Sequence, residues 1–193
     1  MSQGQFNDGD ELSVVRTVIN NNATDAESRI TVLEGKAKIG FLDYNDLATT
    51  TTPLSVTGGG TVKLTNDGLG TFTNKLYPPD GVTDLWDTTT QLFDFTELSL
   101  GAVVHERLDI SITTTGANAE VTGEIELGIG NFPYTLNIFR QYFKNAGTYN
   151  ITIGNFIYMG DNNTLTGGGE FKVTSSNAAS IVVNGWALAV NTR

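Results

Sequence analysis

Cysteine is absent from the 193 residues of this chain, and histidine occurs once, as His105. The absence of cysteine excludes a disulfide scaffold, a thiolate metal site and a cysteine nucleophile. A single histidine also excludes a metal centre built from a histidine cluster. A Ser-His-Asp triad would need His105 as its base, but the Gly-x-Ser-x-Gly nucleophile turn does not occur in the sequence. We therefore predict no catalytic residue, no metal site and no cofactor.

Basic residues and long apolar runs are also scarce. The chain has 11 Lys and Arg residues against 21 Asp and Glu, which gives a formal net charge of -10 and a pI of about 4.4. Because phosphate neutralisation needs clustered Lys and Arg, we expect no nucleic-acid partner. No apolar run approaches the roughly 20 residues of a membrane-spanning helix, and the first residues, Ser2–Glu11, are polar. We therefore expect no membrane insertion and no signal peptide, in a protein made in a cytoplasm.

Turn signals recur between short β-rich runs over most of the chain. Charged residues make up 17% of the sequence, and Thr, Asn and Gly take their place, a mixture typical of β-rich extracellular or virion proteins. Asn66-Asp67-Gly68 and the glycine run Gly167-Gly168-Gly169 are strong turn signals. About eight to ten strands at this spacing, with long connections, predict an all-β fold, an antiparallel jelly-roll sandwich of two sheets.

Two runs alternate clearly between apolar and polar residues. In Val103–Thr113 one face carries Val104, Glu106 and Leu108, and the other face carries His105 and Arg107. Glu120–Ile129 alternates in the same way. Since successive side chains in a strand point to opposite faces, we predict a long antiparallel pair with one face exposed to water. The aromatic residues of Val82–Leu100 are interpreted as core.

The last apolar run, Ile181–Val190, alternates between large and small residues. Trp186, Leu188 and Val190 share one face, and Gly185, Ala187 and Ala189 share the other. A face of small side chains lets another backbone approach closely. We therefore predict that Gly185, Ala187 and Ala189 take part in strand or subunit packing.

Residues 11–34 are the only stretch that predicts a long helix, and Gly35 can end it. Its seam has the spacing of a heptad repeat and consists of Leu12, Arg16, Ile19, Ala23, Ala26, Ile30 and Leu33. Two interpretations stay open: the seam packs on the β domain, or it forms a short parallel coiled-coil neck that registers three chains. In the second case Leu12, Ile19, Ala26, Ile30 and Leu33 are oligomerisation residues. The change in composition after Gly35 predicts two parts, residues 1–35 and 36–193.

Aromatic and polar residues near predicted loops are candidates for ligand binding, because aromatic rings can stack on sugars and Asn or Asp can bond hydroxyl groups. The candidates are Tyr44, Tyr77, Tyr134, Tyr158, Asp161 and Asn163. Paired carboxylates could also hydrolyse glycans. Asp80, Asp84 and Asp87, and also Glu124 and Glu126, lie close enough in sequence, but among 21 acidic residues such pairs are expected by chance.

Several segments resemble structural proteins encoded by tailed bacteriophages. The segments are Phe72-Thr73-Asn74-Lys75 followed by Gly81–Asp87, then Arg107-Leu108-Asp109, Phe132-Pro133-Tyr134, Tyr158-Met159-Gly160-Asp161 and Val183-Asn184-Gly185-Trp186. The N-terminal heptads, which end in Leu33-Glu34-Gly35, look like the neck before many phage fibre heads. The resemblance covers roughly residues 12–193. It implies a homotrimeric jelly roll, similar to tumour-necrosis-factor-like heads, on the exterior of a virion, and it carries over no functional residue.

Two functions follow from this resemblance, and both are non-enzymatic. In the first, the chain is the knob of a tail or head fibre, joined to other virion proteins through residues 1–35, and it contacts a host surface polysaccharide or protein receptor. In the second, it is a decoration or cement protein that stabilises the capsid. A glycan-hydrolysing spike is a third, more distant alternative.

Overall fold

The computed structural model describes residues 18–28 and 38–193. The chain divides into two compact units, Met1–Ala37 and Lys38–Arg193. In the first unit residues 18–28 form a helix, on which Ile19 is 61% exposed. Leu12, Ile30 and Leu33 of the predicted seam lie outside the described residues. Within the described part of the chain, no helix has both the length and the apolar character needed to cross a membrane.

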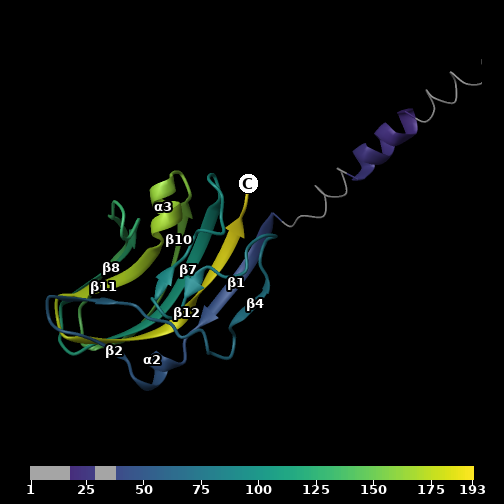
Figure 1. Cartoon of the computed structure of the whole chain (residues 1–193). Coiled ribbons are helices and arrows are strands. Elements are labelled where there is room, and N and C mark those ends of the chain that lie inside the picture. The colour runs from purple at the N-terminus through teal and green to yellow at the C-terminus, as the bar shows by residue number, and fades with distance from the viewer. Residues whose placement is uncertain (1–17, 29–37) are drawn as a thin grey trace, which may run out of the picture. The chain divides into compact units, whose positions relative to one another are not determined.

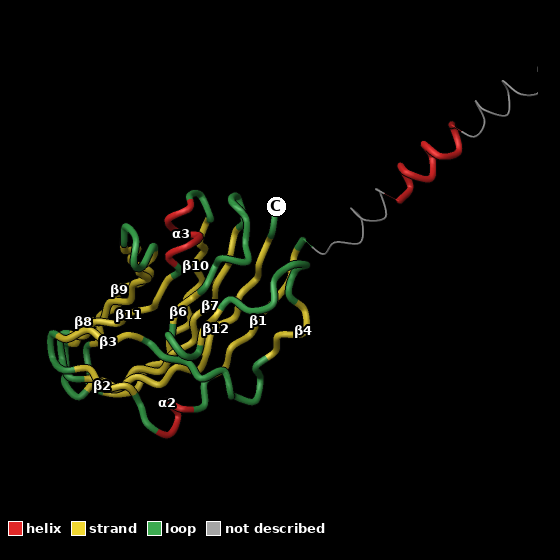
Figure 2. Tube along the Cα trace, viewed as in Figure 1, coloured by secondary structure: helices red, strands yellow, loops and turns green. Residues whose placement is uncertain are grey.

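The second unit consists of two antiparallel sheets, shown in Figures 1 and 2. Sheet A contains β1 (Ile39–Asn45), β2 (Leu54–Val56), β4 (Asn74–Tyr77), β7 (Val103–Thr114), β10 (Gly147–Tyr158) and β12 (Ala179–Asn191). Sheet B contains β3 (Gly60–Lys63), β5 (Trp86–Asp87), β6 (Leu92–Phe93), β8 (Ala119–Leu127), β9 (Tyr134–Phe143) and β11 (Gly169–Ser175). Two short helices, α2 (Ala48–Thr51) and α3 (Asn162–Gly167), lie at opposite ends of the sandwich.

The strand pairing is that of a jelly roll. β8 pairs with β9, β7 with β10, β3 with β11 and β1 with β12, so early and late strands pair as nested antiparallel partners. The order in sheet A is β10-β7-β12-β1-β4, and in sheet B it is β5-β6-β11-β8-β9. Two such sheets connected by crossovers make the jelly-roll sandwich, which confirms the predicted fold class.

Alternation explains why the long strands bury one face. Along β7 and β8 every second residue is buried, as the sequence predicts. Glu106 belongs to the buried face of β7 and is the one charged side chain there. Burying a carboxylate in a core costs free energy unless the group is paired or neutral.

Aromatic rings fill the space between the sheets. The rings of Trp86 and Trp186 are 4.4 Å apart, and Phe93 lies 4.9 Å from Trp86 and 5.2 Å from Phe171. All four side chains are buried, and so is Phe95. The aromatic residues of Val82–Leu100, Trp86, Phe93 and Phe95, therefore belong to the core as predicted, and each contributes roughly 1.5–3 kcal/mol.

The sequence interpretation missed both short helices. At α2 the Asp46 carboxylate, one residue before the N-cap residue Leu47, accepts hydrogen bonds from the Thr49 N–H (2.7 Å) and hydroxyl (2.5 Å). At α3 the N-cap residue Asp161 accepts a hydrogen bond from the Thr164 N–H (2.8 Å). Capping residues of this kind satisfy the free N–H groups at a helix start.

Candidate assembly surface

The outer face of sheet A carries a row of side chains from four neighbouring strands. In register, Phe41 of β1 pairs with Ala189 of β12, Ala189 pairs with His105 of β7, and His105 pairs with Phe156 of β10. Residues that pair directly across antiparallel strands point to the same face, about 5 Å apart. Four segments that are distant in sequence thus form one continuous row on the outer face.

Large apolar side chains gather around this row. In the adjacent row Ile39 pairs with Asn191, Asn191 pairs with Val103, and Val103 pairs with Tyr158. The first row is extended beyond Phe41 by Tyr77 of β4, which pairs with it. The exposed fractions are 57% for Phe41, 59% for Phe156, 56% for Tyr158, 60% for Ile39 and 66% for Tyr77. We call these five residues, with His105, Ala187 and Ala189, the apolar half of sheet A. Contiguous exposed apolar area of this kind marks interaction sites on soluble proteins.

A shallow hollow of about 350 Å³ lies within the apolar half. Ala187 and Ala189 contribute small side chains to it, while Phe41, His105 and Arg107 line it from the strands on either side. Trp186, Leu188 and Val190, by contrast, point into the core. The large-small alternation of the last run therefore separates a core face from an exposed face on β12.

The other half of the same face is polar. Thr113 bonds Thr148 (2.7 Å), and Ser111 bonds Asn150 (2.7 Å) across the β7–β10 pair. Further along, the Thr152 hydroxyl donates to Asp109 (2.6 Å). These side chains satisfy one another at the surface, so the outer face combines an apolar region with a polar border, as protein interfaces commonly do.

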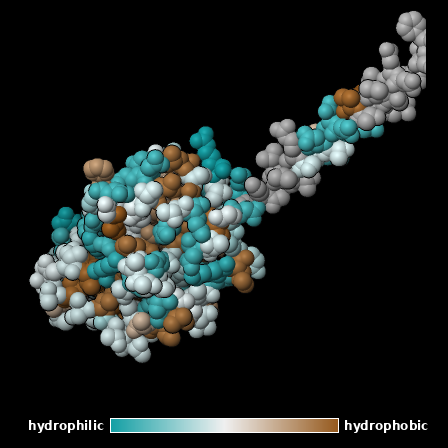
Figure 3. All heavy atoms as spheres, in the orientation of Figure 1, coloured by the Kyte–Doolittle hydropathy of each residue, from teal (hydrophilic) through white to brown (hydrophobic). Residues whose placement is uncertain are grey.

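Other exposed hydrophobic residues are dispersed. Figure 3 shows one face of the molecule, on which hydrophobic residues form separate groups among hydrophilic ones. Phe72, 81% exposed, and Phe132 each lie on a loop outside the sheet face. Scattered apolar residues are normal on protein surfaces. The apolar half of sheet A differs because its residues are contiguous in register.

Gly185 does not belong to this exposed face, contrary to the sequence interpretation. It is buried where the β7–β12 register shifts between Val183 and Gly185, and its φ is +143°. A Cβ at this position would lie 2.4 Å from the Tyr44 carbonyl oxygen. The small size of Gly185 therefore serves packing within its own sheet, whereas Ala187 and Ala189 remain on the outer face.

Three of the predicted ligand-binding residues come together around α3. The Tyr134 hydroxyl bonds the Thr164 hydroxyl (2.8 Å), Asp161 caps α3, and the Asn163 side chain exchanges two hydrogen bonds with the backbone of Phe132. These polar groups hold the loop before β9 against the helix. Tyr158 and Tyr77 lie instead in the apolar half of sheet A.

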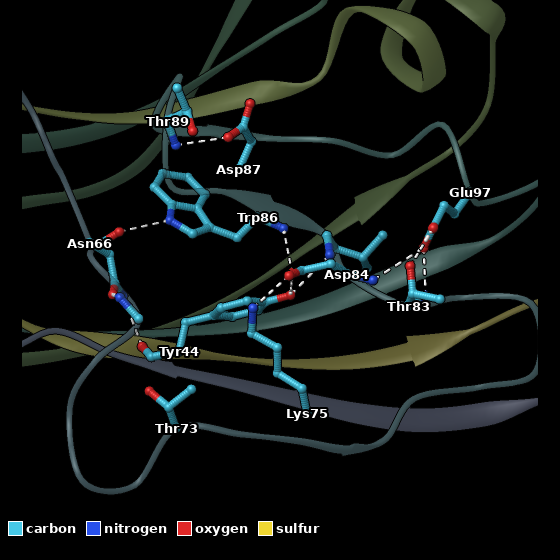
Figure 4. Close-up of polar contacts among 12 residues, drawn as sticks. Tyr44, Asn66, Thr73, Lys75, Thr83, Asp84, Trp86, Asp87, Thr89 and Glu97 are labelled. Atoms are coloured by element: carbon cyan, nitrogen blue, oxygen red, sulfur yellow. Dashed lines mark hydrogen bonds and ion pairs between the residues drawn. The ribbon is translucent and has the colours of Figure 1, made fainter.

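Tyr44 cannot serve as a stacking platform, because it is fully buried. Its hydroxyl donates to Asp84 (2.6 Å), as Figure 4 shows. It also accepts a hydrogen bond from the Leu85 N–H (2.9 Å). Burial, and then the bond to Asp84, raise the pKa of Tyr44 well above its usual value. Burial alone would raise the pKa of Asp84, but hydrogen bonds from Lys75 and Tyr44 outweigh it and hold that pKa below its usual value. Tyr44 is a structural residue that alternation in β1 could have identified.

Four acidic residues of Val82–Leu100 line a hollow of about 370 Å³. They are Asp84, Asp87, Asp94 and Glu97. Their carboxylates are occupied by nearby donors: Asp87 accepts from the Thr89 N–H, Asp94 from the Thr96 N–H and Glu97 from the Thr83 N–H. Hydrogen bonds lower the pKa of Asp87, first that from the Thr90 hydroxyl. Over residues 18–28 and 38–193, no group of three or more ligating side chains is placed to hold a metal ion.

The sequence did not predict that four outward residues would lie side by side in one row. They are Phe41, Ala189, His105 and Phe156. The alternation within each strand predicts which residues face outward, but the row depends on the register between segments up to 148 positions apart (189 minus 41). The pair Ala187 and Ala189 was the only signal of it in the sequence.

No protein-family model matches this chain, and no curated protein matches it. Among solved structures, one of the infectious bursal disease virus Gx strain is similar over 81% of this chain and 30% of its own, at 8% identity and a TM-score of 0.35. The PRD1 vertex protein P5 is similar over 80% of this chain and 72% of its own, at 8% identity and a TM-score of 0.39. Eiger TNF from S. frugiperda is similar over 82% of this chain and 94% of its own, at 7% identity and a TM-score of 0.38. Because these scores are low, the jelly-roll assignment rests on the strand pairing of the chain itself.

Proposed function

We propose that this protein is a non-enzymatic structural protein of a bacteriophage virion, which forms a homotrimeric knob through the apolar half of sheet A. The observation that carries the proposal is the exposed row Phe41–Ala189–His105–Phe156 with its apolar neighbours. The virion assignment rests on the resemblance of the sequence segments to phage structural proteins.

The exposed area suits a second copy of the chain as the occupant. Aromatic side chains bury about 150–250 Å² each, so four that are more than half exposed supply roughly 350–600 Å². The four are Phe41, Tyr77, Phe156 and Tyr158. Ile39, His105 and the stem of Arg107 add to this area, which then approaches the roughly 800 Å² per partner of a stable interface.

The acidic residues support a structural role rather than glycan hydrolysis. Hydrolysis needs one carboxyl group whose pKa is raised, so that it can protonate the leaving oxygen. The pKa values of Asp84 and Asp87 are lowered instead, and Glu126 forms an ion pair with Lys172. Asp84 and Asp87 therefore lack the raised pKa that the acid of this reaction requires.

The knob would be joined to other virion proteins through residues 1–35 and would contact the host surface with its loops. Exposed Ile19 and Ala26 on the helix are available to a coiled-coil neck that registers three chains. Three weak sites for a host polysaccharide or protein receptor on one knob would gain avidity through effective concentration. The end of the sandwich that carries α3, with Tyr134, Asp161 and Asn163, is the proposed contact.

The assembly surface is tested by charge substitutions in the intact chain. Phe41→Asp and Phe156→Asp should each reduce the solution mass toward that of one chain, because a carboxylate buried in an apolar interface is costly. Phe72→Asp is the control, since Phe72 is more exposed but lies on a loop outside the face. Static light scattering measures the mass. A trimer that survives both sheet substitutions would exclude this face as the interface.

A second experiment separates the knob from a capsid decoration protein. Purified protein should compete with virions for adsorption to the host if it is an attachment knob. Unchanged adsorption, together with capsids that rupture at lower temperature when they lack the protein, would assign it to the decoration class instead.

A further inference from the structure

We propose that His105 makes the assembly surface pH-sensitive: the surface closes when the imidazole is neutral and opens when it is protonated. This inference rests on the proposed self-association through the apolar half of sheet A. It adds a control of assembly to that proposal.

His105 is the only histidine of the chain, and it lies in the middle of the apolar row. On one side it pairs with Ala189, and on the other its ring lies 6.2 Å from the ring of Phe156. Phe41 follows beyond Ala189 in the same row. A copy of the chain that covers this row would therefore remove the imidazole from water among apolar groups.

Among the described residues, no carboxylate forms an ion pair with His105. On β7, Arg107 is the next outward residue, and its Nε lies 2.9 Å from Asp109 Oδ2. Asp109 also accepts a bond from Thr152 of β10. On β1 the outward carboxylate is Asp43, which lines the same hollow as His105 but lies in the next row, two strands away from it. β12 presents Ala187 and Ala189 here, and β10 presents Gly154 and Phe156. A protonated His105 would thus stand beside a second cation and apolar groups.

Histidine is the side chain that changes charge between about pH 5 and 8. A neutral imidazole can be covered by apolar groups at small cost, whereas an unpaired imidazolium loses its hydration. If the closed surface admits only the neutral form, the association constant per site falls about tenfold for each pH unit below the titration range. Because a trimer contains three copies of His105, the effect on the complete assembly is the product of three such factors.

The test measures the dissociation of the intact chain by light scattering over a dilution series at pH 8 and pH 5.5. We expect the wild type to be trimeric at pH 8 and to dissociate at least tenfold more readily at pH 5.5. His105→Gln keeps a neutral polar side chain and should remain trimeric at both pH values. His105→Lys carries a permanent charge and should dissociate at pH 8, while its circular dichroism spectrum stays that of the wild type.

The outcomes separate the two proposals. A wild type that is monomeric at pH 8 would overturn the proposed self-association, and this inference with it. A wild-type trimer that is equally stable at both pH values would overturn only the role of His105. The same holds if His105→Gln dissociates in acid like the wild type, or if His105→Lys remains trimeric at pH 8.

Discussion

Glu106 is the residue that departs most from its surroundings. Its side chain is buried on the core face of β7, where Oε1 lies 3.4 Å from Asn155 Nδ2 and Oε2 has no hydrogen-bond partner among residues 18–28 and 38–193. Burial raises the pKa of Glu106 to about 8, against an ordinary value of 4.5. The folded protein therefore holds this proton over a pH range in which the unfolded chain has lost it.

Glu106→Gln should remove a pH dependence of stability. Because the folded pKa is raised, the favourable contribution of the protonated group is complete below pH 4.5 and is lost as the pH rises to about 8. At pH 9 the variant should be more stable than the wild type by an amount on the order of 5 kcal/mol, while near pH 4.5 the two should differ little. Urea unfolding at both pH values measures the difference.

Glu124→Gln is the matched control for this prediction. Glu124 lies on the outer face of β8 and points away from the core. Its substitution should change stability equally at both pH values. A gain in stability at pH 9 that is the same for both variants would refute the account of Glu106.

At the scale of the elements, the strands β8 and β9 pack closely at one glycine, where an aromatic ring of β9 lies against the backbone of β8. Gly123 of β8 pairs with Phe139 of β9, and a Cβ at position 123 would lie 1.9 Å from the Phe139 ring. The ring thus occupies the space that any other side chain would need. Packing of this kind fixes how the edge strand β9 lies on sheet B.

Gly123→Ala should lower the free energy of unfolding by about 1–3 kcal/mol, because the added methyl group forces the aromatic ring aside. Gly154→Ala is the control, since a Cβ there would have only the Glu106 carbonyl oxygen within reach, at 4.0 Å. It should leave stability unchanged or raise it by about 0.5 kcal/mol. Urea denaturation of the two variants side by side would disprove the packing argument if Gly123→Ala were as stable as Gly154→Ala.

The helix at residues 18–28 allows a separate test of the neck. Ile19→Asp places a charge in the predicted seam and should weaken the trimer at least tenfold in the intact chain. Asn21→Asp adds the same charge within the same helix but away from the seam, and it should have little effect. Sedimentation equilibrium compares the two. Equal weakening by both, or by neither, would assign the helix a role other than a coiled-coil neck.

How far the sequence predicted these elements depended on their length. The strands β7 and β8 were predicted well, because nine or more residues give several repeats of the two-residue period. The helices α2 and α3, with four and six residues, are too short for a helical period to be visible. Asp161, three residues before Thr164, was the available capping signal for α3.

At the scale of the whole molecule, the sequence predicted the class of fold but not the shape of the site. Turn spacing and alternation were enough for a two-sheet jelly roll. The assembly surface needed the register of β1, β7, β10 and β12, which places Phe41 beside Ala189 and His105 beside Phe156. Tyr44 did not need this register, because it occupies a buried position of the alternation within β1.

The charge of the molecule would oppose the proposed assembly. Three chains of formal charge -10 would together carry -30, and this self-repulsion must be overcome by buried apolar area. Salt screens such repulsion over about 8–10 Å at physiological ionic strength. The proposed trimer therefore depends on the aromatic residues of sheet A rather than on ion pairs.

The most direct test of the central claim is the solution mass of the intact chain at neutral pH, measured by light scattering. One chain has a mass of 20.7 kDa, and self-association as a trimer predicts three times this value. A mass of 20.7 kDa that persists as the concentration is raised would contradict the account, because the exposed row on sheet A would then have no second copy to cover it.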